Sequence, residues 1–258
     1  LGAENRPTYS LAEEVMAMAF SEHPYGHMVI GHEQDLKAIT RDELYGHYRR
    51  FYAPDNAFIT VAGDVDPDDM IARIDRAFGG IPASAQPLPR VVGDPPQRGE
   101  RRVTVRKATP AAYLMMAYRM PEARHPDVPA LMVADALLSG AKAMGMGGGG
   151  GMGRSSRLYK AMVSTGLARS ASSGTSLHID PHLWTFSATA LPGVEPERIE
   201  AAIEAEILRL QTELADEADF LKARKQIRAQ YVYANESVSS QAFWLGQMEI
   251  VDRAARVD

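Results

Sequence analysis

The sequence predicts an α+β fold in which helices pack on one face of a mostly antiparallel sheet. Strand-like segments occur in neighbouring pairs, within residues 101–120 and 167–191, rather than alternating singly with helices. Amphipathic helical segments lie before, between and after these pairs. The 258 residues, of which 45% are hydrophobic and 24% charged, are enough for one large or two ordinary globular domains, each with its own core.

Two helices are predicted near the start of the chain, over residues 11–20 and 41–52. Each follows a hydroxyl residue that has a glutamate three positions later, which is the spacing of a capping box. The two capping pairs are Ser10 with Glu13 and Thr40 with Glu43. The connecting residues 21–33 contain a proline and two glycines and lack helical periodicity, so we expect an irregular connection there.

A buried strand and a third helix are predicted next. Residues 57–63, with the sequence AFITVAG, are a short apolar run that ends in glycine, which is typical of a buried strand. Asp66 and Pro67 then precede the amphipathic segment 68–78. We therefore expect Asp66 to cap a helix that ends at the pair of glycines following residue 78.

A linker is predicted over residues 81–99, which contain five prolines and no hydrophobic periodicity. Residues 1–90 are interpreted as the C-terminal remainder of a first domain, and residues 91–258 as a complete second domain. The elements predicted in the second domain are strand 101–107, strand 111–120, helix 127–139, helix 155–163, strand 167–174, strand 183–191 and three final helices. An apolar stripe marks the first of these final helices, formed by Ile199, Ile203, Ile207, Leu210 and Leu214.

Charge and composition exclude several classes of function. The formal net charge of −5 is dispersed along the chain, which argues against nucleic acid as a partner. No apolar stretch approaches the roughly 18 to 20 residues that a membrane span requires. The chain has no cysteine, which excludes disulfides, thiolate catalysis and cysteine-bound metals.

A glycine run is the main candidate for a binding site. Seven of the nine residues from Gly145 to Gly153 are glycine, and a basic, hydroxyl-rich segment follows. The run is not a phosphate-binding loop of the GxxxxGK[ST] type, because Met152, Gly153 and Arg154 stand where that motif requires lysine. Free backbone N–H groups beside arginine are suited to a carbonyl, a carboxylate or an extended peptide. A flexible surface connection without a ligand is the alternative. The candidate binding residues are Gly147, Gly148, Gly149, Gly150, Gly151 and Arg157.

Two histidine pairs have the spacing of helical zinc ligands. His23 and His27 are four residues apart, as are His178 and His182. Both pairs enclose a proline, so neither segment is expected to form the regular helix that would bring the two rings together. We interpret them as loop histidines that form local hydrogen bonds rather than as metal ligands.

Longer motifs resemble a known family. The segments ENRPTYSLAEEVMAMAF, HPYGHMVIG, DLKAIT, YAPDNAFITVAGDV and GGGGGMGRSSRLYKAMVSTGLA occur in this order. In combination they resemble the insulinase/pitrilysin family of zinc metallopeptidases, and in particular bacterial members related to the mitochondrial processing peptidase. The resemblance extends over nearly the whole chain.

The resemblance implies a fold and a chemistry. Family members are built from two-domain α+β halves that close like a clamshell around an unfolded peptide. One half binds zinc through an inverted HxxEH motif and a further glutamate, and the zinc acidifies a water molecule and polarises the scissile carbonyl. This sequence contains no HxxEH. We therefore expect a fragment that begins past the catalytic centre, carries no catalytic or metal-binding residue and is inactive alone.

The resemblance also bears on partners. Zinc-less partner halves of the family carry an arginine and a tyrosine seven residues apart, whereas YKAMVSTGLARSAS has no tyrosine after Gly166. The chain is therefore expected to come from a zinc-bearing half that binds peptide or unfolded polypeptide and forms a homodimer or a heterodimer with a second peptidase-like subunit. The alternatives are a non-catalytic core subunit and a peptide-binding module. Bacterial members occur in the cytoplasm and in the envelope, which leaves the compartment open.

Overall fold

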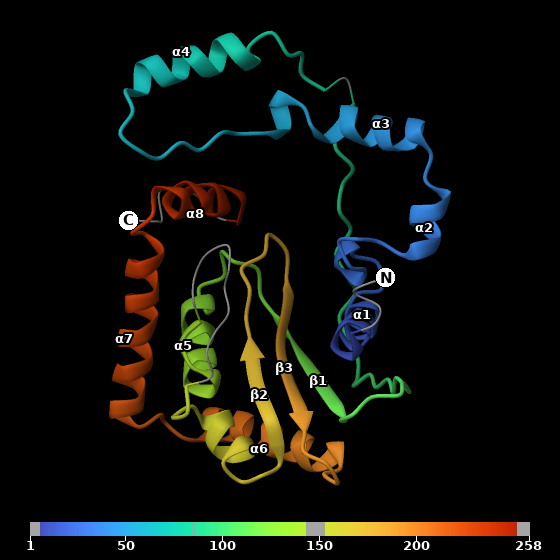
Figure 1. The fold of residues 1–258 in the computed structure, drawn as a ribbon, viewed down its shortest axis with the longest axis vertical. Coiled ribbons are helices and arrows are strands. Elements are labelled where there is room, and N and C mark those ends of the chain that lie inside the picture. The colour runs from blue at the N-terminus through green and yellow to red at the C-terminus, as the bar shows by residue number, and fades with distance from the viewer. Residues whose placement is uncertain (1–5, 85, 143–152, 252–258) are drawn as a thin grey trace.

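A computed structural model of the chain describes residues 6–84, 86–142 and 153–251. It confirms the predicted α+β class, with a three-stranded antiparallel sheet in the order β1–β3–β2 (Figure 1). The strands are β1 (Tyr113–Met120), β2 (Ala168–Gly174) and β3 (His182–Ala190). Each matches a predicted strand to within three residues at either end. The central strand β3 pairs with both neighbours, so one slip of its register would turn its apolar side chains away from the core.

The helices of the second part of the chain pack against this sheet or against one another. They are α5 (Val128–Ser139), a short π-helical turn η3 (Tyr159–Val163), α6 (Pro196–Thr212), α7 (Glu217–Ala234) and α8 (Val238–Val251). Alternate residues of β3 face them, because successive side chains of a strand point to opposite faces. Phe186 is fully buried and lies in one cluster with Leu138 of α5, Met162 of η3 and Ile199 of α6. This cluster is the core of the sheet domain.

The first part of the chain forms helices but little core. Its elements are α1 (Pro7–Ala19), η1 (Pro24–Gly26), α2 (Glu33–Ala38), α3 (Arg41–Phe51), η2 (Pro54–Asn56) and α4 (Pro67–Phe78). α1 packs beside β1, whereas α2, α3 and α4 extend away from the sheet as an arm (Figure 1). We call residues 29–103 the arm. Both helix starts predicted there are confirmed, since Thr40 and Glu43 form a complete capping box and Asp66 accepts a hydrogen bond from the Asp69 N–H at 2.9 Å.

Two predicted strands are wrong. Residues 57–63 and 101–107 have no strand structure. Phe58, Ile59 and Val61, expected in a core, are 48%, 51% and 41% exposed. A strand satisfies its backbone N–H and C=O groups only through a neighbouring strand. No strand in the described ranges pairs with either segment, so their strand-like sequences stay extended and unpaired.

Smaller corrections concern element boundaries. The first helix begins at Pro7, whose missing N–H suits the first turn, so Ser10 lies inside the helix and does not cap it. The predicted helix 155–163 is largely the π-helical turn η3. Leu214 lies beyond the end of α6 and is fully exposed, so it does not extend the apolar stripe. Within the described part of the chain, no helix is long and apolar enough to cross a membrane.

Candidate functional site

The candidate glycines Gly147, Gly148, Gly149, Gly150 and Gly151 lie outside the described residues. The structure describes the residues on either side of them instead. Before it, α5 ends at Gly140, whose φ of 85° is a conformation that glycine adopts readily. After it, the hydroxyl of Ser155 accepts a hydrogen bond from Lys222 of α7. The described residues that precede the run therefore lie at the end of α5, and those that follow it lie beside α7.

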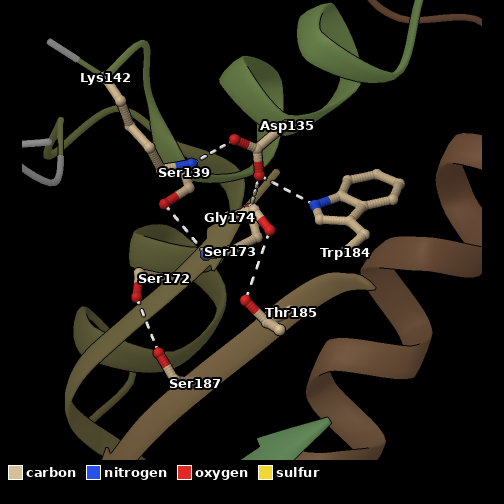
Figure 2. A network of polar contacts seen from close by, with 9 residues as sticks. All are labelled: Asp135, Ser139, Lys142, Ser172, Ser173, Gly174, Trp184, Thr185 and Ser187. Atoms are coloured by element: carbon tan, nitrogen blue, oxygen red, sulfur yellow. Dashed lines mark hydrogen bonds and ion pairs between the residues drawn. The ribbon is translucent and has the colours of Figure 1, made fainter. Parts of the chain in front are cut away.

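A buried carboxylate anchors the first of these ends. Asp135 of α5 is only 5% exposed and accepts hydrogen bonds from the Ser173 hydroxyl and from Trp184 Nε1, the latter at 3.0 Å (Figure 2). It also forms an ion pair with Lys142. A buried charge is costly unless it is paired and hydrogen-bonded, and Asp135 is both. We call Asp135 and its three donors the Asp135 network.

Local structure brings these groups together. Asp135 and Ser139 are four residues apart and so lie on one face of α5. The Ser139 hydroxyl accepts a hydrogen bond from the Ser173 backbone N–H at 3.2 Å, beside the contact between Asp135 and Ser173 (Figure 2). Strand β2 is thereby fixed to the last turn of α5. The network holds in place the last turn of α5, which precedes the glycine run in sequence.

A cavity of about 300 Å³ lies beside the Asp135 network. Its walls come from α5, α7, α8 and residues 175–177, and are formed mainly by Met132, Ala136, Leu177, Ile227, Phe243 and Trp244. Trp244 Nε1 is buried and has no acceptor among the described residues. The cavity suits an apolar group, and its one carboxylate already has three donors.

Arg157, the predicted binding residue after the glycine run, is half-buried in the turn that leads into η3. Its Nη1 is buried and meets no acceptor in the part of the chain that the structure describes. Guanidinium N–H groups form strong, often paired hydrogen bonds to carboxylates, and they also bind carbonyl oxygens. Nη1 is therefore an unused donor among the described residues, in a side chain that is only partly exposed.

His23 of the first histidine pair lies near both members of the second pair, which the sequence did not predict. His178 and His182 stack with their ring centroids 3.7 Å apart, and Tyr25 lies 5.3 Å and 5.0 Å from them. His23 lies 4.2 Å from Tyr25, and Phe20 lies 5.6 Å from His182. We call these five residues the histidine cluster. It joins residues 20–25, before the arm, to residues 178–182 at the start of β3.

The cluster is not arranged to bind a metal. His23 Nδ1 accepts the Tyr25 backbone N–H at 3.0 Å, and its Nε2 lies 3.2 Å from Asp180 Oδ2, so both ring nitrogens are engaged. The other two rings are nearly parallel, with an interplanar angle of 16°, so their lone pairs do not converge on one point. Across the described ranges, no three His, Cys, Asp or Glu side chains are grouped to hold an ion. His23 matches the prediction of local hydrogen bonding.

Burial changes the titration of this cluster. It lowers the pKa of His178. Burial, followed by the neighbouring His178, lowers the pKa of His182 to about 4. The neutral forms of both rings are therefore favoured near neutral pH.

Comparison with known proteins places this chain in a family. The sequence profile of the peptidase M16 inactive domain matches residues 38–227, more than half of the chain. An uncharacterized zinc protease of Mycobacterium tuberculosis is 27% identical over 258 residues, which cover 96% of this chain and 54% of that protein. A probable mitochondrial-processing peptidase subunit beta of Arabidopsis thaliana is 24% identical over 237 residues, covering 91% of this chain and 44% of that protein.

Solved structures agree on the fold. The crystal structure of a protease from Helicobacter pylori matches 97% of this chain and 59% of that one, with a TM-score of 0.88 and 23% identity. This chain spans about half the length of the curated relatives it matches. Zinc is the cofactor of the family, as the names of these relatives indicate, but neither the histidine cluster nor any other described group fits it. The chain belongs to the peptidase M16 family, and most of it corresponds to that family's inactive domain.

Proposed function

We propose that this chain is the substrate-binding and structural portion of a zinc-dependent metalloendopeptidase that encloses peptides between two halves. One observation carries the proposal: residues 38–227 match the inactive domain of a family whose relatives are named zinc proteases, in a chain without HxxEH. The zinc ligands and the general base would then be supplied by polypeptide other than these 258 residues.

The exposed arm supports a division into residues 1–90, as part of a first domain, and residues 91–258, as a second. Leu44, Tyr48 and Ile71 lie on helices of the arm and are 58%, 52% and 63% exposed. Amphipathic helices normally bury such residues against another element. Because this chain spans about half the length of its relatives, the polypeptide that would cover the arm belongs to the remainder of a protein of their length.

The glycine run and Arg157 are the proposed peptide-binding residues. Backbone N–H groups of glycines approach a bound main chain closely because no side chain intervenes. Arg157 Nη1 is buried and has no acceptor among the described residues, so a rearrangement of the side chain would let it donate to a peptide carbonyl or carboxylate. The Asp135 network would hold one end of the run in place and so lower the entropy lost on binding.

Metal content and peptide cleavage test whether the zinc site and the catalytic activity are supplied by polypeptide other than this chain. We expect this chain alone to bind no stoichiometric zinc and to cleave no peptide, and the protein of its relatives' length to hold one zinc per chain and to cleave. Elemental analysis and a quenched-fluorescence peptide assay measure both properties. Tightly held zinc together with cleavage by this chain alone would contradict the proposal. Zinc-free, inactive protein of full length would instead favour a non-catalytic core subunit.

Fluorescence anisotropy with a labelled extended peptide tests the binding residues. Arg157→Ala should weaken binding by about tenfold, the size of one lost charge-assisted hydrogen bond. Arg169→Ala is the matched control, because Arg169 is exposed on β2 and its loss should leave affinity within about twofold. Equal losses in both variants would show that general positive charge, rather than Arg157, attracts the peptide. Such a result would refute the assigned role of Arg157 while leaving the peptidase proposal open to the zinc test.

A further inference from the structure

We propose that the histidine cluster is an acid-sensitive clasp, which holds residues 20–27 against residues 178–182 while its rings are neutral and releases them when the rings gain protons. The clasp would connect the segment that leads into the arm with the sheet domain. The proposal concerns a conformational change in this chain and does not depend on peptidase function.

Contacts from residues far apart in sequence define the clasp. Phe20 is 4% exposed and His23 is 7% exposed, so this end of the first segment is inserted rather than resting on the surface. Tyr25 packs edge-on against His178 and His182, at 5.3 Å and 5.0 Å. Aromatic contacts of this kind stabilise a contact beyond the area they bury. The ring contacts of Phe20 and Tyr25 with the two histidines attach one segment to the other.

Neutral rings suit this arrangement and charged rings do not. With His178 and His182 stacked at 3.7 Å, protons on both would place two positive charges at close range in a partly buried site. His182 Nδ1 is buried without a partner among the described residues, so a proton there would add an N–H with no acceptor. Both effects favour separation of the stack when the rings are protonated.

Other charged groups around the clasp either favour or oppose a positive charge on its histidine rings. Arg119 of β1 lies over the Phe20 ring at 4.4 Å and opposes a positive charge on His182. Asp180 lies beside His23, and a proton on that ring would strengthen their contact. The Leu183 backbone favours the protonated form of His182, but burial and the charges of His178, His23 and Arg119 together outweigh it.

A second carboxylate holds the segment by its backbone. Asp94 accepts the N–H groups of Ser21, Glu22 and His23. Burial raises the pKa of Asp94, but these hydrogen bonds outweigh burial and keep it below its usual value. Asp94 therefore stays charged while the histidines titrate. The clasp is expected to loosen at the aromatic contacts first.

The direction of the pH effect follows from the lowered pKa values. The ordinary histidine pKa is 6.5, and His182 in the clasp has a pKa of about 4. Between these two values the open form binds more protons than the closed form, so closure weakens as pH falls. The clasp is thus fully stable above about pH 6.5 and loses its stabilisation progressively as pH falls from there towards 4.

Hydrogen–deuterium exchange of the backbone amides of residues 20–27 tests the clasp, after correction for intrinsic exchange rates. Between about pH 7.5 and pH 5, protection of these amides should fall on the order of tenfold, with little change in β3. The double variant His178→Phe and His182→Phe keeps two aromatic rings and removes both titrating groups. Its protection should change less than about twofold over the same range.

His47→Phe is the matched control, because His47 also stacks on an aromatic ring, Phe51, at 4.4 Å, but lies in α3 outside the clasp. This variant should keep the full response. Unchanged protection of the original protein between the two pH values, or a full response in the double variant, would overturn the proposal.

If the double variant unfolds, a pH titration of the histidine rings of the original protein, followed by NMR, tests the clasp instead. His178 and His182 must then both titrate below the ordinary histidine pKa, together with shifts of the Phe20 and Tyr25 rings. Titration of both histidines near the ordinary value of 6.5 would refute the clasp.

Discussion

The arm and the sheet domain contain similar apolar residues, yet they differ sharply in burial. In the sheet domain, Phe186 and Leu138 are fully buried and Ile199 is 1% exposed. In the arm, Leu44 and Ile71 are 58% and 63% exposed. Apolar patterning therefore specifies which face of a helix is available for burial. A second surface is needed before that face contributes to stability.

Helices and strands respond differently to the lack of a second surface. Helices α3 and α4 form in the arm because a helix satisfies its own backbone hydrogen bonds and because Thr40 and Asp66 cap the starts. Residues 57–63 remain unpaired because a strand depends on a neighbour. Thr60 does bond to the Ala242 carbonyl of α8 at 2.9 Å, but a single side-chain contact does not replace a ladder.

Core truncation should give the largest difference between the two regions. Phe186→Ala removes a fully buried ring and should lower the free energy of unfolding by about 3 to 5 kcal/mol. Phe58→Ala, the same change at a 48% exposed position in the arm, should cost less than about 1 kcal/mol. Urea unfolding followed by circular dichroism measures both. Equal costs would mean that the arm has a core of its own.

Removing the buried carboxylate should give the next largest effect. Asp135→Ala leaves Ser173, Trp184 and Lys142 without their acceptor and should cost about 3 kcal/mol. Asp69→Ala is the control in the arm, where the ion pair with Arg73 is exposed and should contribute under about 1 kcal/mol. The same urea titration applies. A cost for Asp135→Ala no larger than for Asp69→Ala would show that the Asp135 network does not stabilise the domain.

Loss of a helix cap should have a smaller effect that is confined to the arm. Thr40→Ala removes the hydroxyl that accepts the Glu43 backbone N–H, while the residue 40 backbone N–H can still donate to Glu43, and should destabilise α3 by about 1 kcal/mol. Hydrogen exchange of the α3 amides measures this change. Ser10→Ala is the control, because Ser10 lies within α1 and caps nothing, so α1 should keep its protection. If the α1 amides lose protection in that variant, Ser10 does cap the helix, as predicted from the sequence.

The smallest effect is expected at the exposed apolar face of the arm. Leu44→Ser should change the stability of this chain by less than about 0.5 kcal/mol, because Leu44 is already exposed. In a protein of its relatives' length the same substitution should cost about 2 kcal/mol or more, if the remaining polypeptide buries this face. Thermal unfolding of the two proteins, each with and without the substitution, makes the comparison. Equal small costs in both would show that the arm stays uncovered.

Prediction from sequence succeeded where the signal was local or repeated. The strands at 111–120, 167–174 and 183–191 are confirmed as neighbours in one antiparallel sheet, and the motifs resembling zinc metallopeptidases are confirmed by the family match. The roles of Gly147–Gly151 and Arg157 stay predictions. The Asp135 network gave no sequence signal beyond a lone aspartate in an apolar helix, because its donors come from three other segments.

The sequence by itself determined the starts of α3 and α4, the α+β class and the family, since capping residues, hydrophobic periodicity and long motifs are properties of neighbouring residues. Tertiary structure alone decided which apolar segments are buried and that His23 forms one cluster with His178 and His182. His23 and Asp180 are 157 positions apart, and nothing in either segment specifies the other. Burial and long-range contact depend on the surface that meets a segment, and that surface is set by the packing of the whole chain.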